Sequence, residues 1–407
     1  MDSIRRRISC HLKSVPSRRQ NVASWYFLML LLSGRRNSLT AAAQLSGMAL
    51  SSFSTWLSRS SVEAAGVLTE LLCTAIANVQ RKPLVPGAPW NVAIIVDATL
   101  HRRSRSSIDN AQKFNHGKGW VVGHQWTNIV LLIDGITLPM APIPFYTKGY
   151  CKKHGLTYKS EHTRVREYLW SLDLSPVIGK HEDHEIVVLM DSGYDDRNLY
   201  QTILMRGWDL VCGLRSDSQV RFASGRFRRV GDLFTSAGLE WKTVYAFTDR
   251  WKKRMDFRVS SLPLELRAVK VQAQVVCSEP RRDRLKSSRK FLYCSLPELD
   301  LGVVVRTYRL RWAVEIFHRD IKSHLGLEDV SAQSFDSVEA HVRWLYATYL
   351  FLLVQYPEET TARAQEKVRA EFEANKYGKV ARLADRFGGS KQVKRHCQAV
   401  VEELMAS

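Results

Sequence analysis

Two short runs of apolar residues constrain the fold of this chain more than any other feature of its sequence. Val92–Val96 is one run and 185–190 is the other, and each is followed directly by an aspartate, Asp97 or Asp191. Apolar runs without polar alternation are typical of strands buried on both faces of a sheet. The ends of two such strands could deliver both carboxylates to one cleft. An aspartate that only begins a turn after a strand would explain either residue equally well.

The segments around these runs follow the strand and helix order of an RNase H-like domain. Asp134-Gly135 separates two apolar stretches and is typical of a hairpin turn, so three antiparallel strands should come first. Other mixed folds share parts of this order, so the order indicates the α/β class more firmly than one particular fold. The expected elements are strands at 92–96, 126–133 and 136–145, a helix at 160–172, a strand at 185–190, a helix at 197–206 and a strand at 209–214.

Changes in hydrophobic period divide the chain into four expected regions. The pattern is helical up to the stretch 81–89, where three prolines and a glycine end it. Apolar and polar residues alternate at 255–260 and 269–275, which predicts half-exposed antiparallel strands. We therefore expect a helical region at 1–88, a mixed domain at 89–214 and 297–330, an antiparallel β insertion at 215–296 and a helical C-terminal region at 331–407.

The balance of charge points to a polyanionic partner. The 407 residues include 60 Lys and Arg against 40 Asp and Glu, which leaves a formal net charge of +20 at pH 7. Each phosphate that such residues neutralise releases a condensed counterion and adds affinity that falls with salt. Nucleic acid is therefore favoured over an anionic membrane. A single basic cluster would be typical of a solvated loop, but the chain carries six of them.

Other classes of protein are disfavoured by the sequence. Its seven cysteines form no CxxC pair, so neither a disulfide framework nor a structural zinc site is indicated, and a reducing cytoplasm is expected. The longest apolar runs are far below the roughly 20 residues of a membrane helix, and a GxxxxGK[ST] loop for a nucleotide cofactor is missing. Two groups of possible ligands lack zinc-ligand spacing: Cys151 with His154 and His162, and His181 with His184.

The segment Leu39–Leu57 resembles a helix-turn-helix with its turn at Gly47. Phe53 and Trp56 would face inward in the second helix. The hydroxyl-bearing residues on its other side would then face DNA: Ser51, Ser52, Ser54 and Thr55. Two short amphipathic helices that only pack against the rest of the chain would give a similar pattern, so that alternative stays open.

The segment 308–322 carries the most specific pattern. No proline or glycine interrupts it, so we expect one helix with successive residues about 100° apart. Its polar face, within an arc of roughly 60°, comprises Tyr308, Arg311, Glu315 and Lys322, and its apolar face comprises Leu310, Val314, Phe317 and Ile321. A surface i,i+4 ion pair would explain Arg311 with Glu315 but neither of the other two polar residues.

The spacing Y-(2)-R-(3)-E-(6)-K of this polar face is similar to the signature of bacterial insertion-sequence DDE transposases of the "IS four" family. The segment IIVDAT around Asp97 resembles the first acidic block of that family, and VLMDSGY around Asp191 resembles the second. The resemblance covers Asp97–Lys322. It implies an RNase H-like (retroviral integrase superfamily) catalytic core with a β-strand insertion, flanked by helical regions, of which 1–88 would bind DNA.

The resemblance also implies roles for individual residues. Asp97, Asp191 and Glu315 would be the catalytic acids and would hold two Mg²⁺ ions, with Mn²⁺ as a substitute, because hard carboxylate oxygens suit these cations. Phosphates of the DNA would be contacted by Tyr308, Arg311, Lys322 and Arg319, and Trp312 would stack on a flipped base. Trp241 and Trp251 are weaker candidates for stacking, and packing on the sheet is favoured for both.

We therefore expect a cut-and-paste DDE transposase, which is a polynucleotidyl transferase and endonuclease. Its partners would be double-stranded DNA, namely terminal inverted repeats and target DNA, and a second copy of the chain, because two ends must be held together. It would act in a prokaryotic cytoplasm, associated with the nucleoid. Two alternatives stay open: a catalytically silent DNA-binding regulator derived from a transposase, and a metal-dependent DNA nuclease without strand transfer.

Overall fold

The computed structural model describes residues 3–32, 38–77, 79–80, 82–104, 107–115, 119–179, 185–222, 225–235, 238–247, 254–267, 269, 272–280, 289–386 and 391–406. The chain forms two compact units. Unit 1 comprises Met1–Ala77, His101–Gly123 and His318–Ser407, and unit 2 comprises Asn78–Leu100 and His124–Phe317. The four regions expected from the sequence stay a prediction.

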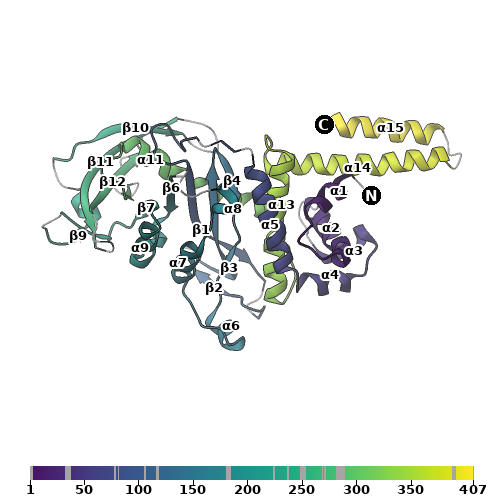
Figure 1. Cartoon of the computed structure of the whole chain (residues 1–407), viewed down its shortest axis with the longest axis horizontal. Coiled ribbons are helices and arrows are strands. Elements are labelled where there is room, and N and C mark those ends of the chain that lie inside the picture. The colour runs from purple at the N-terminus through teal and green to yellow at the C-terminus, as the bar shows by residue number, and fades with distance from the viewer. Residues whose placement is uncertain are drawn as a thin grey trace. The chain divides into compact units, whose positions relative to one another are not determined.

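Unit 2 is built on one mixed sheet (Figure 1). Its strands are β1 (Val92–Arg102), β3 (Trp120–Ile133), β4 (Ile136–Pro139), β5 (Ile143–Pro144), β6 (Ile186–Met190), β7 (Asp209–Leu214), β8 (Gln219–Arg221), β9 (Arg228–Arg229), β10 (Lys242–Phe247), β11 (Arg254–Leu266), β12 (Gln272–Pro280) and β13 (Lys290–Cys294). They lie in the order β3-β1-β6-β7-β13-β12-β11-β8-β9, with β4 and β5 on β3 and β10 on β11. The expected α/β class is confirmed, and the order β3-β1-β6-β7 is consistent with an RNase H-like core.

The two apolar runs lie side by side as parallel strands. β1 pairs with β6 up to Val96 opposite Met190, and the paired residues are buried. Asp97 and Asp191 are the next residues of their strands, so they leave the pairing at the same edge. The expectation that the first strand ends at Asp97 is wrong. β1 continues to Arg102, because its other edge still lies beside β3.

Local signals account for the other core elements. Asp134 and Gly135 have φ of 49° and 78°, which is the geometry of the type I′ turn that joins β3 to β4. The helices α7 (Glu161–Ser171) and α9 (Arg197–Met205) begin after aspartate or serine caps, pack beside each other, and α9 lies on β7. The expected hairpin, both helices and the strands at 185–190 and 209–214 are confirmed. The single strand expected at 136–145 is wrong, because the chain leaves the sheet at 140–142 and forms two short strands, β4 and β5.

The strands after β7 extend the same sheet. β13 pairs antiparallel with β7, with Phe291 opposite Leu214 and Cys294 opposite Val211. β12 pairs with β13, and β11 pairs with β12. The alternating residues 255–260 lie in β11 as expected, whereas Val269 precedes β12 in a turn. The insertion predicted from alternation is therefore continuous with the core sheet through β13.

The segment expected as one helix over 308–322 is interrupted, and this expectation is wrong. α11 (Leu301–Arg309) ends before α12 (Trp312–Ser323) begins. At the break the backbone N–H groups of Leu310 and Arg311 bond to the carbonyl groups three residues earlier, which tightens the chain into turns. Without a proline or glycine the sequence carries no breaker signal at this point. Of the expected apolar stripe, Val314, Phe317 and Ile321 are fully buried, but Leu310 is only half-buried.

Unit 1 is mainly helical. Its elements are α1 (Ser3–Cys10), α2 (Ser17–Leu32), α3 (Leu39–Ser46), α4 (Leu50–Leu57), α5 (Ser61–Ile76), β2 (Gln112–Asn115), α13 (Phe335–Gln355), α14 (Thr361–Arg386) and α15 (Lys391–Ala406), and α12 ends here. α5 lies along α13, and α15 lies along α14 (Figure 1). Trp56 of α4 packs against Tyr26 of α2 and Trp344 of α13, with ring centroids 5.3 Å apart in both pairs.

The helix pair expected at 39–57 is present. α3 ends at Gly47, whose φ of 72° permits the turn, and α4 follows with Phe53 and Trp56 buried. This burial agrees with both a helix-turn-helix and a simple packed pair. No helix in the described part of the chain is long and apolar enough to cross a membrane.

Candidate active site

Asp97 and Asp191 meet where the β1 and β6 pairing ends. Burial raises the pKa of Asp97 to about 7; Arg311 acts to lower it, and Asp191 and Glu315 act to raise it. The two other carboxylates are thus close enough to repel the charge on Asp97. The three acids expected from the sequence therefore interact within unit 2.

Asp191 begins a tight turn that fixes its carboxylate. Its Oδ1 accepts a hydrogen bond of 2.8 Å from the backbone N–H of Gly193, in the short helix η2 (Ser192–Tyr194). Gly213 on the neighbouring β7 leaves room for this turn. A Cβ on Gly213 would lie 2.8 Å from the Tyr308 hydroxyl and 2.9 Å from the Ser192 nitrogen. Tyr308 therefore reaches the same edge of the sheet.

Arg311 is the cation shared by two of the acids. Its Nη2 lies 2.6 Å from Oε1 of Glu315, and its Nη1 lies 3.5 Å from Oδ2 of Asp97. The Arg311 side chain is 16% exposed. Burial alone would lower the pKa of Arg311, but the nearby Tyr308, Asp97 and Glu315 outweigh it and raise that pKa. The guanidinium group therefore stays charged between the carboxylates.

Tyr308 stays a hydroxyl donor in this site. Burial raises its pKa to about 12, while the positive charge of Arg311 opposes the rise. At neutral pH its phenol therefore keeps its proton. A neutral O–H beside a fixed guanidinium suits contacts to phosphate oxygens.

The donor chemistry of the three acids fits a hard divalent cation, but their present placement does not complete a ligand set. Across the described residues, no group of three or more Asp, Glu, His or Cys side chains is close enough together to hold a metal ion. Asp97 and Glu315 share the guanidinium of Arg311 instead. Burial, and after it the charges of Asp191 and Glu315, raise the pKa of Asp97, and a divalent cation would stabilise the charged form of this acid.

The comparison with protein families decides the class of this protein. The family model described as "Transposase DDE domain" matches residues 91–351, which is more than half of the chain. The chain belongs to this transposase family. Such transposases act on DNA and generally use divalent metal ions. None of the curated proteins searched matches the chain.

The structure places the other expected DNA contacts of the transposase in both units. Trp312, at the start of α12 in unit 2, is 47% exposed. Arg319 and Lys322 lie further along α12, in unit 1; Arg319 is exposed and lies 3.3 Å from Asp320. Burial lowers the pKa of Lys322, with Glu328 opposing and Arg102 assisting this shift.

The α4 residues expected to face DNA also belong to unit 1. Ser51, Ser54 and Thr55 are exposed, whereas Ser52 is half-buried. The three exposed side chains are accessible to a ligand, and that of Ser52 is so only in part. Contact with DNA stays a prediction for all of them.

Sequence reasoning missed the buried support behind the acids. Oε1 of Glu161 accepts hydrogen bonds from the hydroxyl groups of Tyr194 (2.7 Å) and Thr127 (2.8 Å), and Oε2 accepts one from Gln125 (2.5 Å). Tyr194 directly follows the Asp191 turn and is 4% exposed. Glu161 thus ties that turn to β3. The only local signal was the cap of α7 at Ser160, which places Glu161 in a first turn but not beside Tyr194.

The weaker candidates of the sequence do not form a second centre in the described residues. Trp241 is half-buried, with the guanidinium of Arg258 4.9 Å and that of Arg289 5.6 Å from its ring, which supports packing. Cys151 is buried. Trp251, His181 and His184 lie outside the described residues.

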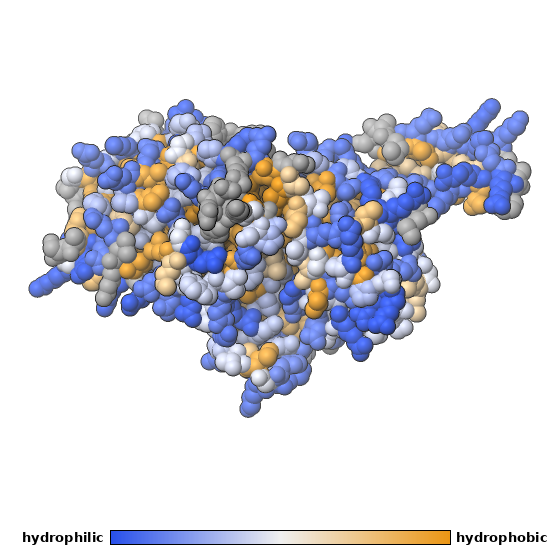
Figure 2. Space-filling model, in the orientation of Figure 1, coloured by the Kyte–Doolittle hydropathy of each residue, from blue (hydrophilic) through white to orange (hydrophobic). Residues whose placement is uncertain are grey.

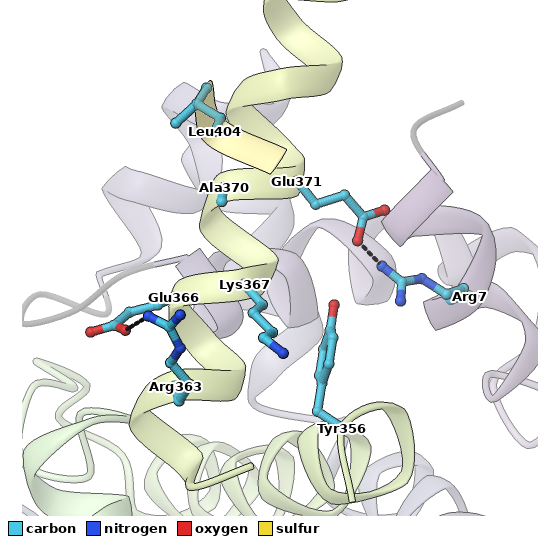
Figure 3. Close-up of a pocket in the computed structure, with 8 residues that line it drawn as sticks. All are labelled: Arg7, Tyr356, Arg363, Glu366, Lys367, Ala370, Glu371 and Leu404. Atoms are coloured by element: carbon cyan, nitrogen blue, oxygen red, sulfur yellow. Dashed lines mark hydrogen bonds and ion pairs between the residues drawn. The ribbon is translucent and has the colours of Figure 1, made fainter. Parts of the chain in front are cut away.

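A cavity of about 650 Å³ in unit 1 lies among α1, the end of α13, α14 and α15 (Figure 3). Arg7 pairs with Glu371 across it, and Arg363 lies 3.4 Å from Glu366. Lys367 pairs with Glu359. None of the three acids expected from the sequence is among the side chains that line this cavity.

Proposed function

We propose that this transposase cuts and rejoins DNA by the cut-and-paste route, with Asp97, Asp191 and Glu315 as its acids, and that it belongs to the "IS four" family with the YREK signature. One observation carries the proposal: Arg311 pairs with both Asp97 and Glu315, while Asp191 acts on the same Asp97. Arg311 thus links an acid of β1 to an acid of α12, and the acid at the end of β6 acts on the first of them.

The proposed cation sites follow from the donors. Asp97, Asp191 and Glu315 would hold Mg²⁺ ions, with Mn²⁺ as a substitute. When bound, these ions would activate the attacking oxygen and stabilise the leaving oxygen of an in-line displacement. For Glu315 to take part, its carboxylate must release Arg311.

The side chains around the acids would orient the DNA. Arg311, once released, and Tyr308 would bind phosphate oxygens of the transposon end, because a guanidinium fork and a neutral hydroxyl both donate hydrogen bonds. Trp312 would stack on an unpaired base. Lys322 and Arg319 would add phosphate contacts further along α12. Glu161, through Tyr194, would keep the Asp191 turn in place.

The rest of the chain would bind and pair the ends. The region 1–88 would contact the terminal repeats through Ser51, Ser52 and Thr55, and the strands between β7 and α11 would form the family's β insertion in an RNase H-like core. Two copies of the chain would hold two ends with two-fold symmetry. The transposase would bind and cut DNA of the nucleoid in a prokaryotic cytoplasm.

The experiment combines cutting with joining. The purified chain is incubated with DNA that carries the natural flanks of its gene and with a target plasmid, in Mg²⁺, Mn²⁺ or EDTA, and the products are sequenced. Metal-dependent excision with joined 3′ ends supports a transposase. Cutting without joining would instead identify the nuclease, and binding without cutting would identify the regulator.

Two variants make this experiment specific. Glu315→Gln keeps the size of the side chain and removes the charge, so excision should be lost. Glu298→Gln is the matched control, because Glu298 is an exposed carboxylate of unit 2 in the turn between β13 and α11, outside the elements that carry the acids. Equal activity in wild type and Glu315→Gln would contradict the proposal.

A further inference from the structure

An arginine-rich hairpin extends the sheet of unit 2 next to the Asp191 turn. The described residues 215–222 and 225–235 contain five arginines, two aspartates and no lysine or glutamate. Most of these arginines lie on or beside β8 and β9, and β9 is the outermost strand in the sheet order. Arg226, Arg228 and Arg229 are exposed. The hairpin was not among the basic clusters found in the sequence, because its arginines are interrupted by apolar residues.

One face of this hairpin carries two arginines, and a third arginine, Arg267 directly after β11, lies near its aromatic ring. Gln219 pairs with Arg229 and Arg221 pairs with Glu265 across the ladders, so alternation places Arg221, Phe227 and Arg229 on the same face. The guanidinium of Arg221 lies 4.7 Å from the centre of the Phe227 ring, and that of Arg267 lies 5.6 Å from it. The face therefore presents stacked guanidinium groups over an aromatic ring.

The charge on this face is not cancelled by its neighbours. The carboxylate of Glu265 is paired with Arg221, which donates hydrogen bonds of 3.0 to 3.1 Å to it. Arg229 and Arg267 are exposed, and neither forms an ion pair with an acid in the described residues. Figure 2 shows hydrophilic side chains interspersed with apolar ones at the end of the sheet where Figure 1 labels β9. Two such faces would repel each other, so a second copy of the same face is a poor partner.

The base of the hairpin is fixed to the turn that holds Asp191. Arg215, between β7 and β8, donates a hydrogen bond of 3.2 Å to the Ser192 carbonyl. Ser218 donates one of 2.6 Å to Asp195, which follows η2 directly. DNA placed at the acids would therefore have this hairpin at a set position beside it.

We infer that the β8–β9 hairpin and Arg267, which directly follows the neighbouring β11, form a DNA-binding surface, on which Arg229 and Arg267 neutralise backbone phosphates of the duplex entering the active site. This inference rests on the proposed function for the position of the DNA. The ring of Phe227 packs against the guanidinium of Arg267, so less side-chain entropy of this arginine is lost on binding. Charged residues also protect edge strands from pairing, but that role requires neither the stacked ring nor the anchor at Ser192.

The test compares two charge reversals of equal size. Arg229→Glu with Arg267→Glu alters the hairpin, and Lys152→Glu with Lys153→Glu alters two exposed lysines on α6 (Lys148–Lys153) of the same unit. Binding of the full chain to a transposon-end duplex is measured from 50 to 200 mM salt. The hairpin variant should bind roughly tenfold or more weakly, and its salt slope should fall by about two, because two phosphate contacts are lost.

Further variants separate charge from damage to the fold. Arg229→Lys with Arg267→Lys keeps the charge and should retain most of the binding, and thermal melting checks that each variant folds. Equal weakening by the α6 and hairpin reversals would overturn the inference, since net charge alone would then explain the loss. An unchanged salt slope in the hairpin variant would overturn it too.

Cutting by the wild type in Mg²⁺, on the same duplex, reports on the proposed function independently. If the wild type cuts and the hairpin variant binds as tightly as the wild type, the hairpin inference fails and the catalytic proposal stands. If the wild type never cuts but the hairpin variant loses binding, the hairpin inference stands and the catalytic proposal fails.

Discussion

Nη2 of Arg311 lies 2.6 Å from Oε1 of Glu315, one turn further along the chain. The same guanidinium reaches Asp97 through Nη1 at 3.5 Å, so one cation balances acids from a helix and a strand. A surface i,i+4 pair would need only the first contact. The second contact makes Arg311 a counter-ion of the candidate active site.

Replacing Arg311 should separate cation binding from DNA chemistry. Arg311→Ala removes a positive charge from between two carboxylates, so Mn²⁺ should bind several-fold more tightly than in the wild type. Cutting should nevertheless fall, because the phosphate contact is lost as well. Calorimetric titration with Mn²⁺ and a cutting assay measure the two effects. Weaker Mn²⁺ binding in Arg311→Ala would show that Arg311 does not compete with a cation for these acids.

The raised pKa of Asp97 makes stability depend on pH in a definite direction. Its folded-state pKa of about 7 lies above the ordinary 3.8, so between these values the folded chain keeps a proton that the unfolded chain has lost. In EDTA, the free energy of unfolding should therefore fall as the pH rises from about 4 to 7. Asp97→Asn removes this term and should stabilise the protein above pH 7, by up to about 4 kcal/mol. Urea unfolding at pH 5 and pH 8 checks this, and an equal effect of the substitution at both pH values would count against it.

Gly213 should tolerate no side chain. In Gly213→Ala the new methyl group would lie under 3 Å from the Tyr308 hydroxyl and from the Ser192 nitrogen, so Tyr308 and the Asp191 turn must move apart. We expect a cost of about 1 to 3 kcal/mol in stability and a loss of cutting. Gly149→Ala is the control, since a Cβ there meets nothing within 4 Å. Full cutting activity in Gly213→Ala would show that this close approach is not needed.

The hydrogen bond from Tyr194 to Glu161 should affect the concentration of Mg²⁺ that cutting requires. Tyr194→Phe removes the hydroxyl group that donates to Glu161 and leaves the buried ring in place. The free energy of unfolding should fall by about 1 to 3 kcal/mol. The Asp191 turn should become looser, so half-maximal cutting should require more Mg²⁺, while binding of DNA stays unchanged. A lower maximal rate at an unchanged Mg²⁺ requirement would argue against positioning of Asp191.

Much of unit 2 could be predicted because its signals are local. The apolar runs before Asp97 and Asp191 form neighbouring parallel strands, and Asp134-Gly135 makes the expected turn. Tyr308, Arg311 and Glu315, which were grouped by their spacing in the sequence, also interact in the structure. Tyr308 and Arg311 remain neighbours because the break at Leu310 is a tight turn.

What the sequence could not show depends on contacts between distant segments. Nothing near Glu161 indicates that Tyr194 and Thr127 will donate to it. The pairing of β13 with β7, which joins the insertion to the core sheet, depends on strand order that alternation does not encode. No proline or glycine marks the break between α11 and α12 in the sequence. The helical periodicity therefore predicted one helix where the structure has two.

Parallel assays of binding and cutting for the three acids test the central claim most directly. Wild type, Asp97→Asn, Asp191→Asn and Glu315→Gln are each given one labelled transposon-end duplex, and its binding in EDTA and its cutting in Mg²⁺ are measured. We expect all three variants to bind the duplex about as well as the wild type and none of them to cut it. Normal cutting by any one variant would contradict a shared active site of Asp97, Asp191 and Glu315.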